Sequence, residues 1–194
     1  MDNAPLIKRF FRPKLIFIVL GLIIAAEVIF AVRTLTKPLP SPPAKLQPIS
    51  GGKVVLLSPS KSYKVGEAIR VTIRVATGGR ATNGTDVVLN YDPKILEAST
   101  SGAIRPGKIY SDYPILTADQ KTGTIRVSGT TSAGSKAFNG IGIFATLNLK
   151  AISAGDTTLR VDFQKDSTTD SNIVESSTTK DILEEVFNLD LKVQ

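Results

Sequence analysis

The side chains that most enzymes use for catalysis are scarce in this sequence. Its 194 residues include no histidine and no cysteine. The common zinc sites and the Ser-His and Cys-His nucleophilic systems therefore cannot be built, which leaves carboxylates, Lys, Tyr and Ser/Thr for any chemistry. Asp112 and Asp119 flank a strand-like segment, but nothing in the sequence brings them to the ~5–10 Å separation that glycoside hydrolysis needs. We expect no enzymatic activity from this chain.

Oxygen-bearing side chains gather in one polar stretch. Asp162, Asp166, Asp170 and Asn172 lie there, with hydroxyl residues between them. Calcium prefers such hard oxygen ligands, so these four residues are candidate metal ligands. Their spacing does not follow an EF-hand loop and lacks its glycine, so a polar surface loop is the simpler interpretation. No other cofactor is indicated.

The net charge of +7 is concentrated near the N-terminus. Residues 1–53 hold eight basic and two acidic residues, a net charge of +6, which leaves +1 for residues 54–194. A nucleic-acid-binding domain usually carries a basic face. The nearly neutral C-terminal part therefore argues against a nucleic-acid partner.

An apolar segment at residues 15–32 predicts a membrane anchor. It reads LIFIVLGLIIAAEVIFAV, with Glu27 as its single charge. As a helix it nearly spans a ~30 Å hydrocarbon core. Four basic residues precede it, so the positive-inside rule predicts a cytoplasmic leader (1–14) and an extracytoplasmic C-terminal part. A cleaved signal peptide ending near Ala25 and Ala26 is the alternative, but the apolar run resumes beyond Glu27.

A proline-rich stretch follows the anchor. Residues 36–52 read TKPLPSPPAKLQPISGG and hold five of the chain's 11 prolines. Such a stretch favours extended polyproline conformation over helix or sheet. We therefore expect residues 33–53 to form a stalk that lifts the folded domain, residues 54–194, away from the membrane.

Period-two alternation dominates the sequence after residue 53 and predicts β-strands. The four longer internal sets are Ile69–Val75, Val87–Tyr91, Ile141–Leu149 and Leu159–Phe163, and a fifth is Phe187–Val193. In the third set the expected inward residues are Ile141, Ile143, Ala145, Leu147 and Leu149. Shorter candidates are Val54–Leu57, Ile109–Tyr110, Ile115–Leu116 and Ile125–Val127. Only Lys180–Val186 in this part of the chain looks helical, and it is short enough to be a turn or the start of a strand instead.

Turn residues separate these candidate strands. Gly, Pro, Asn and Asp clusters such as Asp92-Pro93 and Asn139-Gly140 stand between them. About nine strands with one apolar face each are most simply buried in two packed antiparallel sheets. The expected fold is therefore an all-β sandwich preceded by one transmembrane helix.

The order of two segments resembles the cohesin domain family. These are VLNYDPKIL at Val88–Leu96 and GIFATL at Gly142–Leu147. The resemblance extends from Val54 to Gln194 and implies a nine-stranded jelly-roll sandwich related to cellulose-binding modules. It also implies a dockerin-like partner that carries calcium, which would make calcium a property of the partner more than of this chain.

The resemblance also implies a binding surface on one sheet. The family's Asp just before the Tyr-Asp-Pro turn falls on Asp86, whereas its Asn falls on Gly84, with Asn83 one place away. The strand that ends near Gly129 leads into Thr130 and Thr131, where other cohesins carry an apolar residue and a carboxylate. The candidate partner-binding residues are Asn83, Asp86, Ser128, Thr130 and Thr131.

The function expected from these observations is display at the cell membrane. A cohesin-like module on a single-pass anchor would dock a secreted or surface protein, with a connection to polysaccharide degradation. A carbohydrate-binding module is the first alternative, although four tyrosines and no tryptophan offer few rings for sugar stacking. A structural surface protein or pilin-like subunit is the second, although the prepilin cleavage signature is missing.

Overall fold

The computed structural model describes residues 13–35, 51–98, 102–165, 167 and 169–194. The chain divides into two compact units, Met1–Leu46 and Gln47–Gln194. Most of the expected leader (1–14) and most of the expected stalk (33–53) lie outside the described residues, so both remain predictions.

The described part of the first unit is the helix α1, Pro13–Leu35. Proline suits the start of a helix because its fixed φ is helical and its missing N–H would be unpaired there. The side chains described in α1 run from Phe17 to Phe30, and every one of them is exposed. Over the described stretch, no helix combines the length and the apolar character needed to cross a membrane. The anchor at 15–32 therefore remains a prediction.

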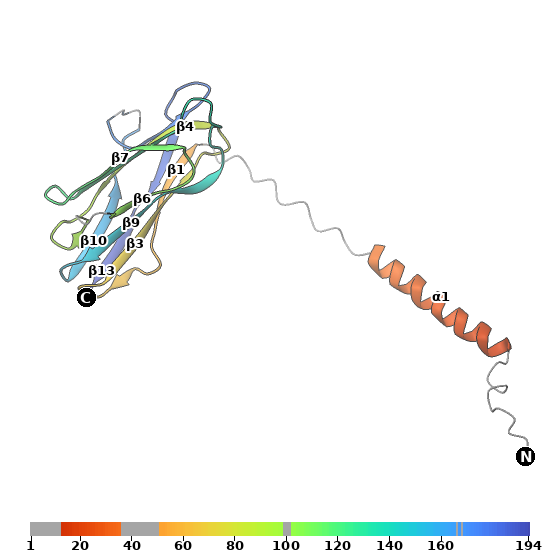
Figure 1. The fold of residues 1–194 in the computed structure, drawn as a ribbon. Helices are drawn as coiled ribbons and strands as arrows, with labels where there is room; N and C mark the ends of the chain where they lie inside the picture. The colour runs from red at the N-terminus through yellow and green to blue at the C-terminus, as the bar shows by residue number, and fades with distance from the viewer. Residues whose placement is uncertain (1–12, 36–50, 99–101, 166, 168) are drawn as a thin grey trace, which may run out of the picture. The chain divides into compact units, whose positions relative to one another are not determined.

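The second unit is a β-sandwich (Figure 1). One sheet has the strand order β12-β1-β3-β9-β5, with β6 also paired to β9; the other has the order β2-β13-β10-β4-β8-β7, with β11 also paired to β4. The strands are β1 (Gly52–Leu57), β2 (Ser62–Tyr63), β3 (Ala68–Ala76), β4 (Thr82–Asn90), β5 (Leu96–Glu97), β6 (Ile104–Pro106), β7 (Asp112–Asp119), β8 (Thr124–Thr130), β9 (Ile141–Ala151), β10 (Gly155–Val161), β11 (Asn172–Glu175), β12 (Leu183–Phe187) and β13 (Leu189–Val193).

The core lies between the inner faces of the two sheets. Every second residue of β3 is buried, from Ile69 to Val75, and β8 buries Ile125 and Val127 in the same way. All residues of the buried core cluster fall between Val54 and Val193. The Gln47–Gln194 unit therefore has a complete core of its own and can fold without the rest of the chain.

The expectation of an all-β two-sheet sandwich is confirmed, but the number of strands is wrong. Thirteen strands are present among the described residues. Four of the additional strands, β2, β5, β6 and β11, contain too few residues to show alternation. The expected strand Phe187–Val193 is two strands in different sheets, β12 and β13, which separate at Asn188. The expected short strand Ile109–Tyr110 is a bend.

The pairing is also not fully antiparallel. β1 pairs with β12, and β13 pairs with β2, in parallel register. Lys180–Val186, which could be a short helix, a turn or the start of a strand, leads into a strand. Asp181 makes a β-bridge to Val174, and β12 begins at Leu183. Burial of Ile182 and Leu183 against the core outweighs the weak local preference for helix.

A β-bulge changes the face on which two expected core residues lie. Ile73 of β3 pairs with Ala145 of β9, but Arg74 pairs with Ile143, so Phe144 is the extra residue. Phe144 and Ala145 are both fully buried, whereas Ile141 and Ile143 are 56% and 49% exposed. The regular alternation expected over Ile141–Leu149 therefore holds only after the bulge.

Candidate protein-binding face

The structure brings the five residues predicted for partner binding to neighbouring positions on β4, on β8 and directly after β8. Asp86 pairs with Ser128, and Gly84 pairs with Thr130. The carbonyl of Asn83 accepts hydrogen bonds from the backbone N–H of Thr131 (2.8 Å) and from the Thr130 hydroxyl (3.2 Å). All five residues therefore belong to one small region of the second sheet.

The outward side chains of these two strands form a surface that we call the β4–β8 face. It comprises Asp86, Val88, Arg126, Ser128 and Thr130. Their direction follows from the buried residues that alternate with them, among them Val87 and Val127. A partner laid on this surface would meet a carboxylate, a guanidinium and two hydroxyls within a few residues of one another.

A recess of about 340 Å³ lies in the β4–β8 face. Asp86, Val88, Arg126 and Ser128 line it, together with Ile115 of the edge strand β7 and Asp170. Ile115 is 44% exposed, whereas Val88 is only 6% exposed although it points outward. The recess therefore combines opposite charges with apolar surface, a mixture that suits a protein side chain better than a flat sugar ring.

One wall of the recess comes from an interruption in a strand. β10 pairs with β4 as far as Val161 opposite Leu89, and β11 resumes along β4 with Asn172 opposite Asp86. The described residues between these points (162–165, 167 and 169–171), which we call the 162–171 loop, lie outside the sheet. The loop is closed where the N–H of Ser171 donates to the carbonyl of Asp162 (3.0 Å). The Ser171 hydroxyl accepts from Val88 N–H (3.0 Å) and so replaces a missing backbone partner in the sheet.

The four predicted metal ligands are distributed along this loop and into β11. Asp162 is exposed, and Asp166 lies outside the described residues. Asp170 is 7% exposed, and one of its carboxylate oxygens accepts the backbone N–H of Gln164. Asn172 donates its amide to Asp86 Oδ2 at 3.3 Å. In the described part of the chain no three carboxylates lie close enough together to hold a metal ion. The four-residue site therefore remains a prediction.

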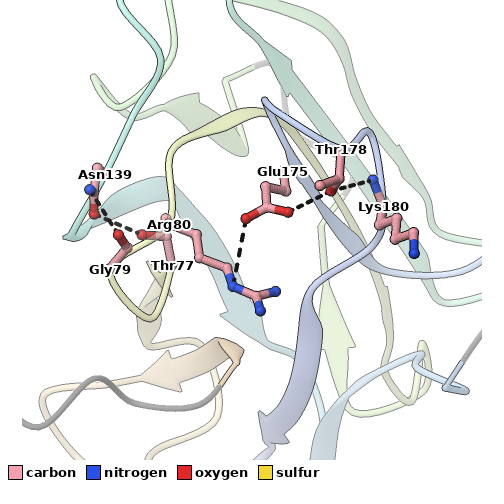
Figure 2. Close-up of polar contacts among 7 residues, drawn as sticks. All are labelled: Thr77, Gly79, Arg80, Asn139, Glu175, Thr178 and Lys180. Carbon is pink, nitrogen blue, oxygen red and sulfur yellow. Dashed lines mark hydrogen bonds and ion pairs between the residues drawn. The ribbon is translucent and has the colours of Figure 1, made fainter.

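The position of β11 is fixed by contacts between two loops (Figure 2). Arg80 lies 3.6 Å from the carboxylate of Glu175, the last residue of β11, and Thr178 donates its hydroxyl to the same carboxylate at 2.5 Å. Asn139 stabilises the turn that precedes Arg80, because its amide donates to the carbonyl of Gly79 (3.0 Å) and its Oδ1 atom accepts from the Thr77 hydroxyl (3.3 Å). These contacts hold the end of β11, and a register shift between Val174 and Glu175 separates them from the pairing of Asn172 with Asp86.

An aromatic cluster supports β8 from the inside. Phe144 packs against Tyr110 and Tyr113, with ring centroids 6.1 Å and 5.5 Å away. Gly129 of β8 faces this cluster so closely that an added Cβ would lie 2.7 Å from Phe144. Burial raises the pKa of Tyr113 to about 12, and burial also raises the pKa of Tyr110. Both hydroxyls are therefore neutral, structural groups.

The two carboxylates considered for acid/base chemistry lie at opposite ends of β7. Strand geometry separates Asp112 from Asp119 by roughly 23 Å, well beyond the distance for glycoside hydrolysis. Asp119 accepts the backbone N–H of Lys121 at 2.8 Å, and this hydrogen bond contributes most to lowering its pKa. These residues are turn and strand-end carboxylates, not a catalytic pair.

A second recess, of about 600 Å³, lies over β10 and β13. Its lining is mostly charged, with Lys61, Arg160 and Lys192 opposed by Asp92, Asp156 and Asp190. None of the residues that line it is a tyrosine. Tyr63, Tyr91 and Tyr110 are each only 6% exposed, so their rings offer little surface for sugar stacking. Although this recess is the larger one, a greater share of its lining is polar than in the recess of the β4–β8 face, and it contains none of the predicted binding residues.

Some features of the β4–β8 face had no signal in the sequence. The 162–171 loop interrupts a strand whose two halves are distant in sequence, so nothing local placed Asp170 beside Asp86. The pairing of Asn172 with Asp86 depends on the same interruption, and sequence analysis gave Asn172 only a metal-binding role.

Comparison with known proteins identifies the folded unit. The family model described as Cohesin domain matches residues 52–194. No curated protein matches the chain.

Solved structures with the same fold cover most of the chain. The third cohesin of ScaC from Acetivibrio cellulolyticus, solved in complex with the ScaB dockerin, has a TM-score of 0.59 at 16% identity and covers 73% of this chain and 98% of its own. A type II cohesin from the cellulosome of the same organism gives 0.58 at 12% identity, with 73% and 95% covered. A non-cellulosomal cohesin from Archaeoglobus fulgidus gives 0.52 at 14% identity, with 74% and 91% covered.

Proposed function

The chain belongs to the cohesin domain family, and from that membership we propose that residues 54–194 dock a dockerin-type protein on the β4–β8 face. The observation that carries the proposal is the antiparallel pairing of Asp86 with Ser128 and of Gly84 with Thr130, because it brings three of the five predicted contact residues to the outward side of two neighbouring strands. Similar solved cohesins include several bound to dockerins, among them the ScaC cohesin.

The chemistry of the face agrees with a helical protein partner. The recess offers a carboxylate and a hydroxyl for hydrogen bonds, and Ile115 on the neighbouring edge strand offers exposed apolar surface. Mixed surfaces of this kind, with an apolar centre and polar surroundings, are typical of specific protein–protein interfaces. The calcium that such a partner needs would be carried by the partner.

We further propose that residues 15–32 hold this module at the cell membrane, with residues 1–14 in the cytoplasm and residues 33–53 as a stalk outside. Support comes from the 18-residue apolar sequence with its basic leader and from the exposure of the side chains Phe17–Phe30 in α1. Membrane fractionation of cells tests this part: the intact chain should resist extraction by salt and dissolve only in detergent. Release of a shorter chain into the medium would favour a cleaved signal peptide instead.

A link to polysaccharide degradation would come through the docked protein and not through this chain. A carbohydrate-binding role is the competing function, and the burial of three of the four tyrosines weakens it. The test is a pull-down from secreted proteins with the full-length chain in detergent, with and without a calcium chelator. A captured protein with paired 12-residue calcium loops, lost on chelation, is expected. Retention of the chain on insoluble polysaccharide without any such protein would contradict the proposal.

A further inference from the structure

Two buried oxygen atoms near the recess have no hydrogen-bond partner. Asp170 is 7% exposed, and its Oδ1 atom makes no hydrogen bond to any described residue. The same holds for Oδ1 of Asn172. Buried polar atoms in folded proteins nearly always have partners, so two unpaired oxygens on residues two positions apart indicate a missing electropositive group.

These two atoms and the Asp86 carboxylate belong to one group. Asn172 lies opposite Asp86 in the sheet and donates to its Oδ2 atom. Asp170 is two residues before Asn172 and lines the recess together with Asp86. The Ser171 between them is held to both the N–H and the carbonyl of Val88. The interruption between β10 and β11 thus brings Asp170 to the recess that Asp86 lines, and it brings Asn172 into contact with the Asp86 carboxylate.

No described basic side chain neutralises the two carboxylates of this group. Arg126 is the one basic residue that lines the recess, and within the described residues it forms no ion pair with either carboxylate. Carboxylate and amide oxygens are the ligands that calcium prefers, and water can complete its six to eight ligands at an open recess. Magnesium fits less well because it demands strict octahedral geometry.

We propose that Asp86, Asp170 and Asn172 form a calcium-type cation site on the cohesin module itself. The site shares Asp170 and Asn172 with the one expected from the sequence, but Asp86 takes the place of the exposed Asp162, and the expected ligand Asp166 lies outside the described residues. Bound cation would fix the end of the 162–171 loop against β4 and so shape the recess. The proposal concerns this chain alone and does not depend on which protein docks.

The experiment is calcium titration of the Gln47–Gln194 fragment in the absence of any partner, followed by calorimetry and thermal unfolding. A dissociation constant near 10⁻⁴–10⁻³ M is expected, as for extracellular calcium modules, with a rise in Tm of roughly 3–10 °C at about 10 mM calcium. Sodium at matched ionic strength serves as the control for screening. No heat of binding and no shift in Tm would overturn the proposal.

Variants identify the ligands. Asp170→Asn should weaken calcium binding by about tenfold or more, because affinity depends on ligand charge. Asp162→Asn is the matched control and should bind calcium like the wild type. Unchanged binding by Asp170→Asn, or loss of binding in Asp162→Asn, would contradict the assignment. If Asp170→Asn does not fold, Asp86→Asn provides the same test. Because no partner is present, failure of this site leaves the docking proposal untouched.

Discussion

The two tyrosines beneath β8 give opposite predictions for the same substitution. The hydroxyl of Tyr110 lies 2.8 Å from the hydroxyls of both Thr82 and Thr85, two residues that are 0% and 1% exposed. Tyr110→Phe leaves the Thr85 hydroxyl buried without a partner, at a cost of about 1–3 kcal/mol. Thr82 keeps its hydrogen bond to the carbonyl of Phe138, so loss of its hydrogen bond to Tyr110 costs only about 1 kcal/mol. The expected loss in free energy of unfolding is therefore about 2–4 kcal/mol.

Tyr113→Phe should cost nothing. The Tyr113 hydroxyl is buried and makes no hydrogen bond within the described part of the chain. Burying a hydroxyl without a hydrogen bond costs free energy, and its removal eliminates that cost. The ring and its contact with Phe144 are kept. We expect the free energy of unfolding to change by less than about 0.5 kcal/mol or to rise. This variant is the matched control for Tyr110→Phe.

Urea unfolding of the Gln47–Gln194 fragment measures both changes. The midpoints should differ while the m-value stays constant. A loss below about 0.5 kcal/mol for Tyr110→Phe, or a loss above about 1 kcal/mol for Tyr113→Phe, would refute the hydrogen-bond assignment.

The pH dependence gives a second readout. The pKa of Tyr113 is raised to about 12 from its usual value near 10. Between these two values the unfolded state has lost the Tyr113 proton and the folded state still holds it. The free energy of unfolding is therefore unaffected by this group below pH ~10 and falls as pH rises towards 12. Tyr113→Phe should therefore lose less stability than the wild type above pH ~10. Equal losses in both proteins would show that Tyr113 does not contribute.

Two further predictions concern residues that support the sheets. Gln120 accepts hydrogen bonds from the Tyr91 hydroxyl (2.8 Å) and from Ala98 N–H (2.9 Å), and donates to the carbonyls of Pro93 (3.0 Å) and Leu96 (2.9 Å). Gln120→Met should cost about 2–4 kcal/mol in urea unfolding, whereas Thr117→Ala on the exposed neighbouring strand should stay within about 0.5 kcal/mol; equal midpoints would contradict this. Gly129→Ala should lower the free energy of unfolding by about 1–3 kcal/mol, because the added Cβ overpacks against Phe144. Gly84→Ala is the control and should be tolerated, because its Cβ would meet its nearest atom at 3.5 Å. An unchanged free energy of unfolding for Gly129→Ala would show that the aromatic cluster can move to accept the methyl group.

The fold class could be predicted from the sequence because burial of one strand face produces alternation in most of the longer strands. β3 follows the pattern throughout, and its burial agrees with the expectation residue by residue. β9 does not, because the bulge at Phe144 reverses the face of Ile141 and Ile143. A bulge is decided by how the two sheets pack and leaves no mark in local alternation.

The candidate binding face divides in the same way. Asp86 and Ser128 could be assigned to one surface from the resemblance to cohesins, and the structure puts them opposite each other in the antiparallel pair of β4 and β8. Asp170 and Asn172 could not be placed there, because their position depends on a loop that leaves the sheet after β10 and returns to it as β11. Loops of this kind are specified by closing contacts, such as those of Ser171 with Asp162 and Val88, which have no sequence period.

The most direct test of the docking proposal compares one substitution on each sheet. Asp86→Arg puts a bulky cation on the β4–β8 face, whereas Thr72→Arg puts the same side chain on the outer side of β3 in the other sheet. With wild type and Thr72→Arg, pull-down from secreted proteins should capture the same protein with paired calcium loops, identified by mass spectrometry, and Asp86→Arg should fail to capture it while remaining folded. Capture by Asp86→Arg together with loss in Thr72→Arg would place the partner on the opposite sheet and contradict the account.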